Sequence, residues 1–193
     1  MADAVIVGKF VGTKGLAAVG ATGTITFLII GFLMGVTTGV TVLTSQKFGA
    51  GRMDEMRKTV GNAAILSAVI AVVMTAVSML GMHRLLVFMH TPEDIFDGAY
   101  GYIMIICAGI FTQVLYNLVS SILRALGNSK TPLYFLILAA GLNIVLDLVF
   151  IIFFHWGAPG AAWATVISQG VSGVLCLIYM WKAVPELKIE KRR

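Results

Sequence analysis

The sequence predicts an all-α integral membrane protein, a polytopic helix bundle, on three observations. Hydrophobic residues make up 59% of the 193 residues and charged residues only 12%, whereas soluble domains carry about 25% charged residues. Five apolar stretches are long enough to cross a hydrocarbon core, which takes roughly 20 helical residues. Basic residues gather at the ends of these stretches, so we expect a lipid bilayer, not nucleic acid, as the partner.

The expected elements follow one another with short polar or glycine-rich breaks. Residues 1–12 hold an apolar segment too short to span, which we interpret as the outer end of a truncated first helix. The bundle is expected over residues 13–183, and a basic cytoplasmic tail or linker over residues 184–193. The expected spans are residues 16–45, 60–82, 95–123, 133–154 and 161–181. The first and third exceed the minimum length, so we expect them to tilt or protrude.

The basic residues also predict an orientation. Eleven lysines and arginines lie on one side of the predicted spans and three lie on the other side. Lysine and arginine favour the cytoplasmic side of a membrane protein. We therefore expect a multi-pass protein of the plasma (inner) membrane with its C-terminus in the cytoplasm.

Asp147 is the most informative residue, because it is a carboxylate inside the apolar run 132–155. An acid at that depth costs at least about 2.5 to 3.5 kcal/mol on insertion scales, and it indicates a functional site. Asn143 lies four residues earlier and so shares its helix face. The pair is predicted to take up a proton or a small cation, because a buried carboxylate needs one or the other.

Polar side chains in two further spans suggest a shared cavity. Gln113, Asn117 and Ser121 recur at four-residue spacing in the third expected span, and Thr165 and Gln169 have the same spacing in the last. Polar groups at this depth face protein or water rather than lipid. The alternative is interhelical hydrogen bonding, worth only about 0.6 kcal/mol per contact. We favour it for Gln113, Ser121, Ser168 and Ser172.

The first expected span carries glycines and a methionine, and each of these allows a structural and a functional interpretation. Three glycines share a four-residue spacing: Gly31, Gly35 and Gly39. They form a ridge that predicts close packing of a neighbouring helix, with a functional bend as the alternative. Met34 is a candidate for the lining of a substrate cavity, together with Gln113 and Gln169, and it is equally a packing residue.

Sequence motifs of catalysis and of metal binding are missing. The chain has no GxSxG, HExxH or phosphate-loop pattern, so we do not expect an enzyme. His83, His90 and His155 lie at or beyond the ends of the expected helices without metal-ligand spacing. We expect no cofactor, and no metal beyond sodium as a coupling ion.

Five stretches of the sequence carry a family resemblance. They are DAVIVGKFVGTKGLAAVGATG, TVLTSQKFGAGR, YNLVSSILRALGNSKTPL, LNIVLDLVFI and GAPGAAWATVISQ. Together and in this order they closely resemble the multidrug and toxic compound extrusion (MATE) family of efflux transporters, most of all the branch related to DNA-damage-inducible protein F. The resemblance implies twelve helices in two lobes around a central cavity, of which this chain would be an N-terminal-lobe fragment.

The resemblance also implies a set of site residues. Asp3 matches an aspartate of the family's first helix, Asn143 and Asp147 match the fifth helix, Thr165 matches the sixth, and Asn117 matches a polar residue of the fourth. In related transporters these groups form a cation site for a proton or sodium, and its loading changes the bend of the first helix. Here only two residues precede Asp3, so that helix cannot span the membrane within this chain.

The implied function is partial secondary active transport. The complete form would export organic, often cationic, drugs in exchange for protons or sodium, with a second lobe or another copy as partner. A flippase for lipid-linked saccharides is one alternative, but it would need several cationic residues in its cavity to hold the phosphates, and the spans themselves offer only Arg124, near a cytoplasmic end. The other alternative is a half-length, non-transporting remnant or a subunit that needs a second lobe from elsewhere.

Overall fold

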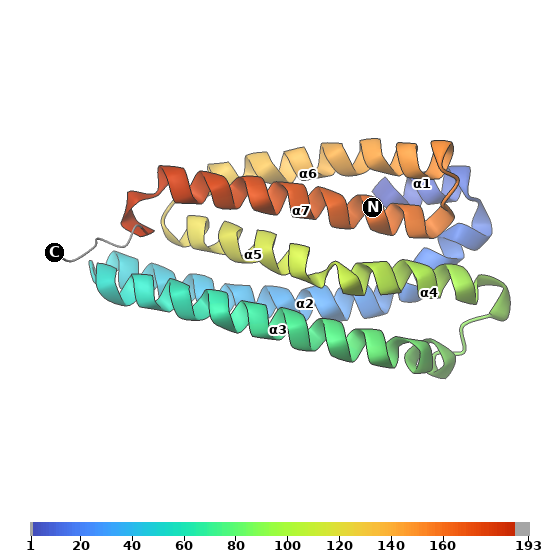
Figure 1. The fold of residues 1–193 in the computed structure, drawn as a ribbon, viewed down its shortest axis with the longest axis horizontal. Coiled ribbons are helices and arrows are strands. Elements are labelled where there is room, and N and C mark those ends of the chain that lie inside the picture. The colour runs from blue at the N-terminus through green and yellow to red at the C-terminus, as the bar shows by residue number, and fades with distance from the viewer. Residues whose placement is uncertain (1, 188–193) are drawn as a thin grey trace.

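The computed structural model describes residues 2–187 as a bundle of helices, with no strand in that range. The elements are α1 (Ala2–Phe10), α2 (Thr13–Gly49), α3 (Met53–Phe88), α4 (Glu93–Ala108), α5 (Ile110–Ala125), α6 (Lys130–Leu148), the π-helix η1 (Val149–Phe153), α7 (Gly157–Ala183) and the 3-10 turn η2 (Pro185–Leu187). The long helices run side by side along the long axis (Figure 1). The predicted all-α membrane bundle is confirmed.

The α4–α5 pair occupies the middle of the bundle. It packs against α2 and α3 on one side and against α7 on the other, while α6 packs on α7 (Figure 1). The pair is correspondingly well buried, with Ile103, Ile110 and Leu123 fully inaccessible. The order of packing is therefore α3 and α2, then α4–α5, then α7 and α6.

Among residues 2–187, four helices are long and apolar enough to cross a membrane: α2, α3, α6 with its π-helical extension, and α7. The α4–α5 pair provides a fifth span, but its two halves are bent by 45°. The third span, expected as one helix over residues 95–123, is therefore broken at Gly109. A β-carbon at Gly109 would lie 2.2 Å from Val166 Cγ2 of α7, so the close approach of α7 requires glycine there.

The glycine ridge of α2 does not pack against another helix within the described residues. A β-carbon at Gly31, Gly35 or Gly39 would meet nothing within 4 Å. The reason is that α2 turns a different face inward, the one that carries Ile25, Ile29 and Leu33. Close contacts of this kind are found instead at glycines of α4, at Gly109 and at glycines of α7, where a β-carbon would meet neighbouring side chains.

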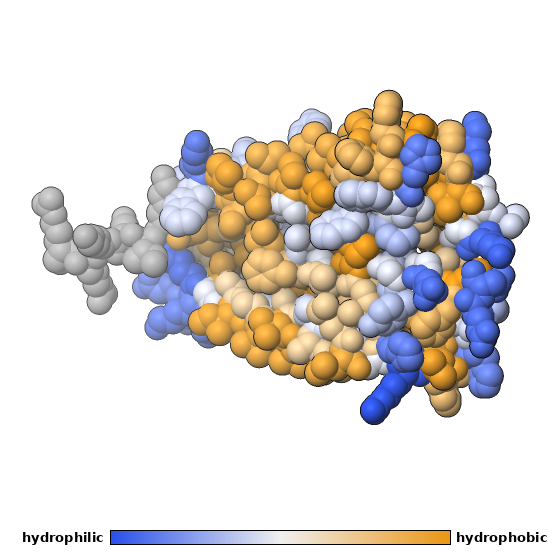
Figure 2. Space-filling model, turned by 45° about the vertical axis from the view of Figure 1, so that its right-hand side comes forward, coloured by the Kyte–Doolittle hydropathy of each residue, from blue (hydrophilic) through white to orange (hydrophobic). Residues whose placement is uncertain are grey.

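The outer surface of the bundle suits a bilayer. Large apolar side chains are well exposed on the outward faces, among them Phe27, Leu80 and Phe153. Figure 2 shows hydrophobic residues over most of the visible face and hydrophilic residues gathered at its two ends. Because exposed apolar surface of this extent is stable against lipid tails and not against water, this surface supports a multi-pass membrane protein.

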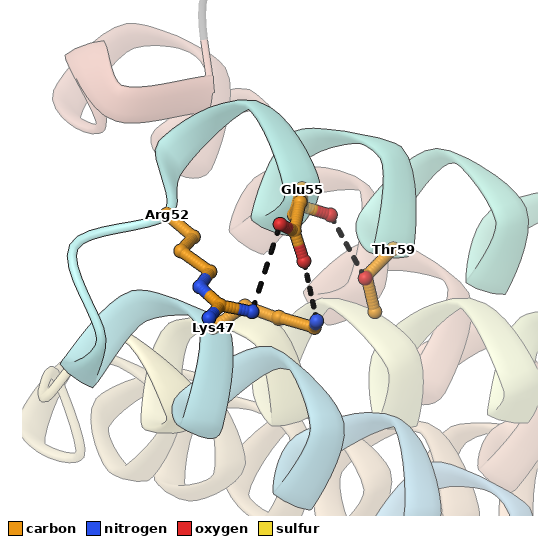
Figure 3. A network of polar contacts seen from close by, with 4 residues as sticks. All are labelled: Lys47, Arg52, Glu55 and Thr59. Carbon is orange, nitrogen blue, oxygen red and sulfur yellow. Dashed lines mark hydrogen bonds and ion pairs between the residues drawn. The ribbon is translucent and has the colours of Figure 1, made fainter.

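One end of the bundle holds most of the described basic residues, and we call it the basic end. It comprises the α2–α3 turn, the α5–α6 turn and the end of α7, with Lys47, Arg52, Lys58, Lys130 and Lys182. At the turn, Lys47 and Arg52 both pair with Glu55, and Thr59 Oγ1 donates to the Glu55 carbonyl at 2.9 Å (Figure 3). Of the predicted basic tail, Lys188, Lys191, Arg192 and Arg193 lie outside the described residues.

The short helix α1 lies at the opposite end, against α6, η1 and α7 as well as α2. Gly12 links it to α2 with a φ of 92°, a conformation that glycine adopts without strain. Val7 of α1 is fully buried, which ties the helix to the bundle. This packing holds Asp3 of α1 against the polar part of α6 and α7.

Candidate functional site

Asp147 of α6 is fully buried. Neither of its carboxylate oxygens has a hydrogen-bond partner among the described residues. The helix changes to π-helical geometry two residues later, at Val149, and such π-helical turns are frequent at functional sites. An ionised carboxylate without partners is strongly disfavoured in a low-dielectric interior, so this group requires a proton or a cation.

Three residues from three helices form a short chain of hydrogen bonds beside it. The Thr165 hydroxyl of α7 donates to Asp3 Oδ2 of α1 at 2.8 Å, with the Ala161 carbonyl as an alternative acceptor at 3.1 Å. The Asn143 amide of α6 donates to Thr165 Oγ1 at 3.3 Å. The structure thus brings together Asp3, Asn143 and Thr165, which are distant in sequence.

The two carboxylates of the site are close enough to interact with one another. Asp3 acts electrostatically on Asp147, and both act on the hydroxyl of Tyr102 in α4. Two neighbouring carboxylates in a poorly solvated site repel one another, and either a shared proton or a bound cation relieves that repulsion. Sequence reasoning did not assign Tyr102 to the site, because tyrosine near a helix end is typical of membrane interfaces.

A polar cavity of about 190 Å³ opens beside this cluster. Its lining comprises Asp3, Leu136, Ala139, Ala140, Asn143, Thr165, Ser168 and Gln169. The cavity therefore includes Gln169, one of the three residues predicted for a substrate cavity. Asp147 is fully buried and does not line this cavity.

The remaining predicted residues lie elsewhere. Asn117 of α5 and Met34 of α2 line a second cavity, of about 310 Å³, together with Arg124. Gln113 of α5 is buried and lines neither cavity. The structure therefore separates Asn117 from Asp3 and Thr165, because its side of α5 faces α2 rather than α6 and α7.

The atoms that could coordinate a cation in the first cavity are oxygens. Within residues 2–187, no three His, Cys, Asp or Glu side chains come together as a metal cluster. Asp3, Asn143 and Thr165 offer carboxylate, amide and hydroxyl oxygens instead. Hard oxygen ligands of this kind suit a proton or a hard cation rather than a transition metal.

The MatE family model matches residues 1–149, more than three quarters of the chain. The chain belongs to the MATE family. Members of this family are transporters and not enzymes, as the sequence predicted.

Individual MATE relatives agree with this assignment. The chain is 33% identical over 180 residues to the probable multidrug resistance protein YpnP of Bacillus subtilis (strain 168). The alignment covers 93% of this chain and 40% of YpnP. It is 28% identical over 173 residues to DNA damage-inducible protein F of Escherichia coli (strain K12), with 87% of this chain and 36% of that protein covered. The family resemblance seen in the sequence is confirmed.

A solved structure of a multidrug resistance MATE family transporter of the MOP superfamily, in an outward-facing conformation, shares the fold. It superposes with a TM-score of 0.92 at 28% identity over 99% of this chain and 42% of that protein. The chain thus spans about 40% of the length of the relatives it matches. Its helices correspond to the N-terminal lobe of a MATE transporter.

Proposed function

We propose that this chain is the N-terminal lobe of a cation-coupled exporter, with Asp3 and Asp147 as the groups that take up a proton or sodium. The observation that carries the proposal is the fully buried Asp147, whose carboxylate has no hydrogen-bond partner among the described residues, beside a second carboxylate. Asn143 and Thr165 supply further oxygens. Asn117 has no contact with this cluster and is left out of the proposed site.

The proposed coupling works through α1. A proton or cation between Asp3 and Asp147 removes their mutual repulsion and favours the docked α1 seen here, against α6 and α7. Without it, the repulsion favours movement of α1 about Gly12, the residue with positive φ that joins it to α2. An ion drives transport only by binding two states with different affinity, and the docked and undocked positions of α1 provide those two states.

The proposed substrates are organic compounds, often cationic, that occupy a cavity between this lobe and a second one. The relative YpnP is named a probable multidrug resistance protein and is more than twice as long as the part matched here, which supports a second lobe. We also propose that the basic end faces the cytoplasm of a plasma-membrane protein, since lysine and arginine favour that side.

The first experiment tests cation binding by this 193-residue chain in detergent micelles. Its unfolding temperature is measured at constant ionic strength while choline is replaced by sodium, and separately across pH. A bound ion stabilises the folded state by mass action, so the wild type is expected to unfold at higher temperature with sodium or with protons. Asp147→Asn, which keeps the shape and removes the charge, is expected to abolish that dependence.

Asp97→Asn serves as the matched control, because Asp97 is an exposed acid of α4 outside the site. It should leave the ion dependence unchanged. An ion dependence that survives in Asp147→Asn would overturn the proposed site. Binding by the wild type, with efflux only after a second lobe is supplied, would identify the chain as one lobe of a two-lobe transporter.

A further inference from the structure

The cavity of about 310 Å³ between α2 and α5 differs in chemistry from the acidic one. Its lining comprises Met34, Thr37, Thr38, Thr41, Val42, Asn117, Ser121 and Arg124. Its lining contains an arginine and no acidic residue, and that arginine, Arg124, lies in the last turn of α5. Its volume falls in the range of small-molecule sites, about 300 to 1,000 Å³.

The α5 wall of this cavity presents hydrogen-bond donors. Asn117, Ser121 and Arg124 lie at i, i+4 and i+7 and so form one stripe. The Arg124 guanidinium donates to Ser121 Oγ at 3.5 Å, which leaves the hydroxyl proton of the buried Ser121 for another acceptor. The Asn117 amide has no hydrogen-bond partner among the described residues, and it adds two further donors.

The charge of Arg124 is not neutralised within the described part of the chain. The ion pairs found there join Lys14 to Asp94, and Lys47, Arg52 and Arg57 to acids of the first turn of α3. No described carboxylate lies within ion-pair distance of Arg124. Guanidinium groups bind carboxylate and phosphate through paired hydrogen bonds, which makes such an anion the matching ligand.

The α2 wall presents hydrogen-bond acceptors, whereas the α5 wall presents donors. Thr38 Oγ1 donates to the Met34 carbonyl at 2.8 Å and Thr41 Oγ1 donates to the Thr37 carbonyl at 2.8 Å. Their hydroxyl protons are therefore engaged with the backbone, so these two oxygens are left to act as acceptors toward a ligand. Met34 and Val42 add apolar surface. A ligand that fits both walls carries an anionic group, hydrogen-bond donors and an apolar body.

We infer that the cavity between α2 and α5 binds the phosphate or carboxylate group of an amphipathic organic molecule, with Arg124 as its principal contact. The ligand is either a soluble anion or the headgroup of an anionic lipid, since both present the same oxygen atoms to the guanidinium. This site is distinct from the proposed cation site, because the two cavities share no lining residue. It also does not depend on which ion drives transport.

The test uses two fluorescent probes that differ in one phosphate group, flavin mononucleotide and riboflavin. The full chain is placed in nanodiscs of phosphatidylcholine at low salt, and probe binding is followed by flavin fluorescence. Flavin mononucleotide is expected to bind about tenfold more tightly, the effect of one charge-assisted contact. Arg124→Gln should remove this preference and Arg124→Lys should keep part of it.

Lys130→Gln is the matched control, because Lys130 is an exposed cation of the basic end outside the cavity. It should retain the preference for flavin mononucleotide. Circular dichroism and unfolding temperature verify that each variant is folded. If the preference persists in Arg124→Gln, or disappears equally in Lys130→Gln, general surface charge explains the binding and the proposed site is refuted.

A second arm distinguishes the two sources of the anion. Nanodiscs are made with phosphatidylglycerol in place of part of the phosphatidylcholine, and lipids that copurify with the chain are quantified. The site binds a lipid headgroup if phosphatidylglycerol competes with flavin mononucleotide. The same conclusion follows if phosphatidylglycerol copurifies with the chain in an Arg124-dependent manner while the flavin does not bind. If the chain shows no preference for flavin mononucleotide and no lipid whose enrichment depends on Arg124, the inference is overturned.

Discussion

At the scale of single residues, Thr165 joins α1 to α6. Its hydroxyl donates to Asp3 and accepts from Asn143. Thr165→Val keeps the side-chain shape and removes both hydrogen bonds. A hydrogen bond to a charged group contributes about 1.5 to 3 kcal/mol, so α1 should be held less firmly against α7. Hydrogen–deuterium exchange by mass spectrometry is expected to show α1 amides exchanging about tenfold faster.

Thr112→Val provides the control for that change. The Thr112 hydroxyl donates to the Gly109 carbonyl three residues earlier, at 2.7 Å, and makes no contact with α1. Exchange in α1 should therefore match the wild type. Equal exchange in Thr165→Val and Thr112→Val would contradict a role of Thr165 in holding α1.

Sequence alone predicted part of this residue-level picture. Asp147 and Asn143 were identified from an acid in an apolar run and from helical spacing, and both lie where three helices meet. Helical spacing does not tell which neighbour a polar stripe faces. Asn117, which the family resemblance assigned to the cation site, lines the cavity between α5 and α2 in this structure. Tyr102 was missed because its electrostatic interaction with Asp3 and Asp147 depends on tertiary packing.

At the scale of elements, the close packing of α7 against the α4–α5 junction depends on Gly109. A β-carbon there would lie 2.2 Å from Val166 Cγ2, far closer than packed atoms approach. Gly109→Ala should therefore force α7 away and destabilise the chain by about 1 to 3 kcal/mol, the usual effect of overpacking. The shift in the midpoint of denaturant-induced unfolding in mixed micelles measures it.

Gly35→Ala is the contrasting substitution in α2. A β-carbon at Gly35 meets nothing within 4 Å among the described residues, and alanine favours helix over glycine by up to about 1 kcal/mol. Its unfolding midpoint should be unchanged or raised. If both variants lower the midpoint alike, loss of glycine flexibility rather than the contact with Val166 would explain the effect.

The positions of the helices were predictable, but their lengths were not. Apolar runs indicate the part of a helix that lies in lipid, whereas helices continue beyond it where polar residues suit them. The second expected span began at residue 60, yet α3 begins at Met53, with Asp54 and Glu55 in its first turn, where acids favour helix formation. The break at Gly109 had no signal, because a glycine within an apolar run also fits a continuous helix.

At the scale of the whole molecule, the bilayer explains why the fold class could be predicted. A chain in lipid must satisfy its backbone hydrogen bonds within each span, so long apolar runs become helices with little choice. The order in which helices pack has no such rule. The central position of α4–α5, for example, follows from its close contacts with α2, α3 and α7 and could not be derived from hydropathy.

The orientation of the bundle is testable with single introduced cysteines. The natural Cys107 and Cys176 are both buried, so a polar maleimide should label them weakly. Ser129→Cys lies at the basic end and Glu93→Cys at the opposite end, and both positions are exposed. Because the basic end is expected in the cytoplasm, an impermeant maleimide added to intact cells should label Glu93→Cys and leave Ser129→Cys unlabelled until the membrane is broken. The reverse pattern would invert the bundle and place Arg124 and its cavity on the external side.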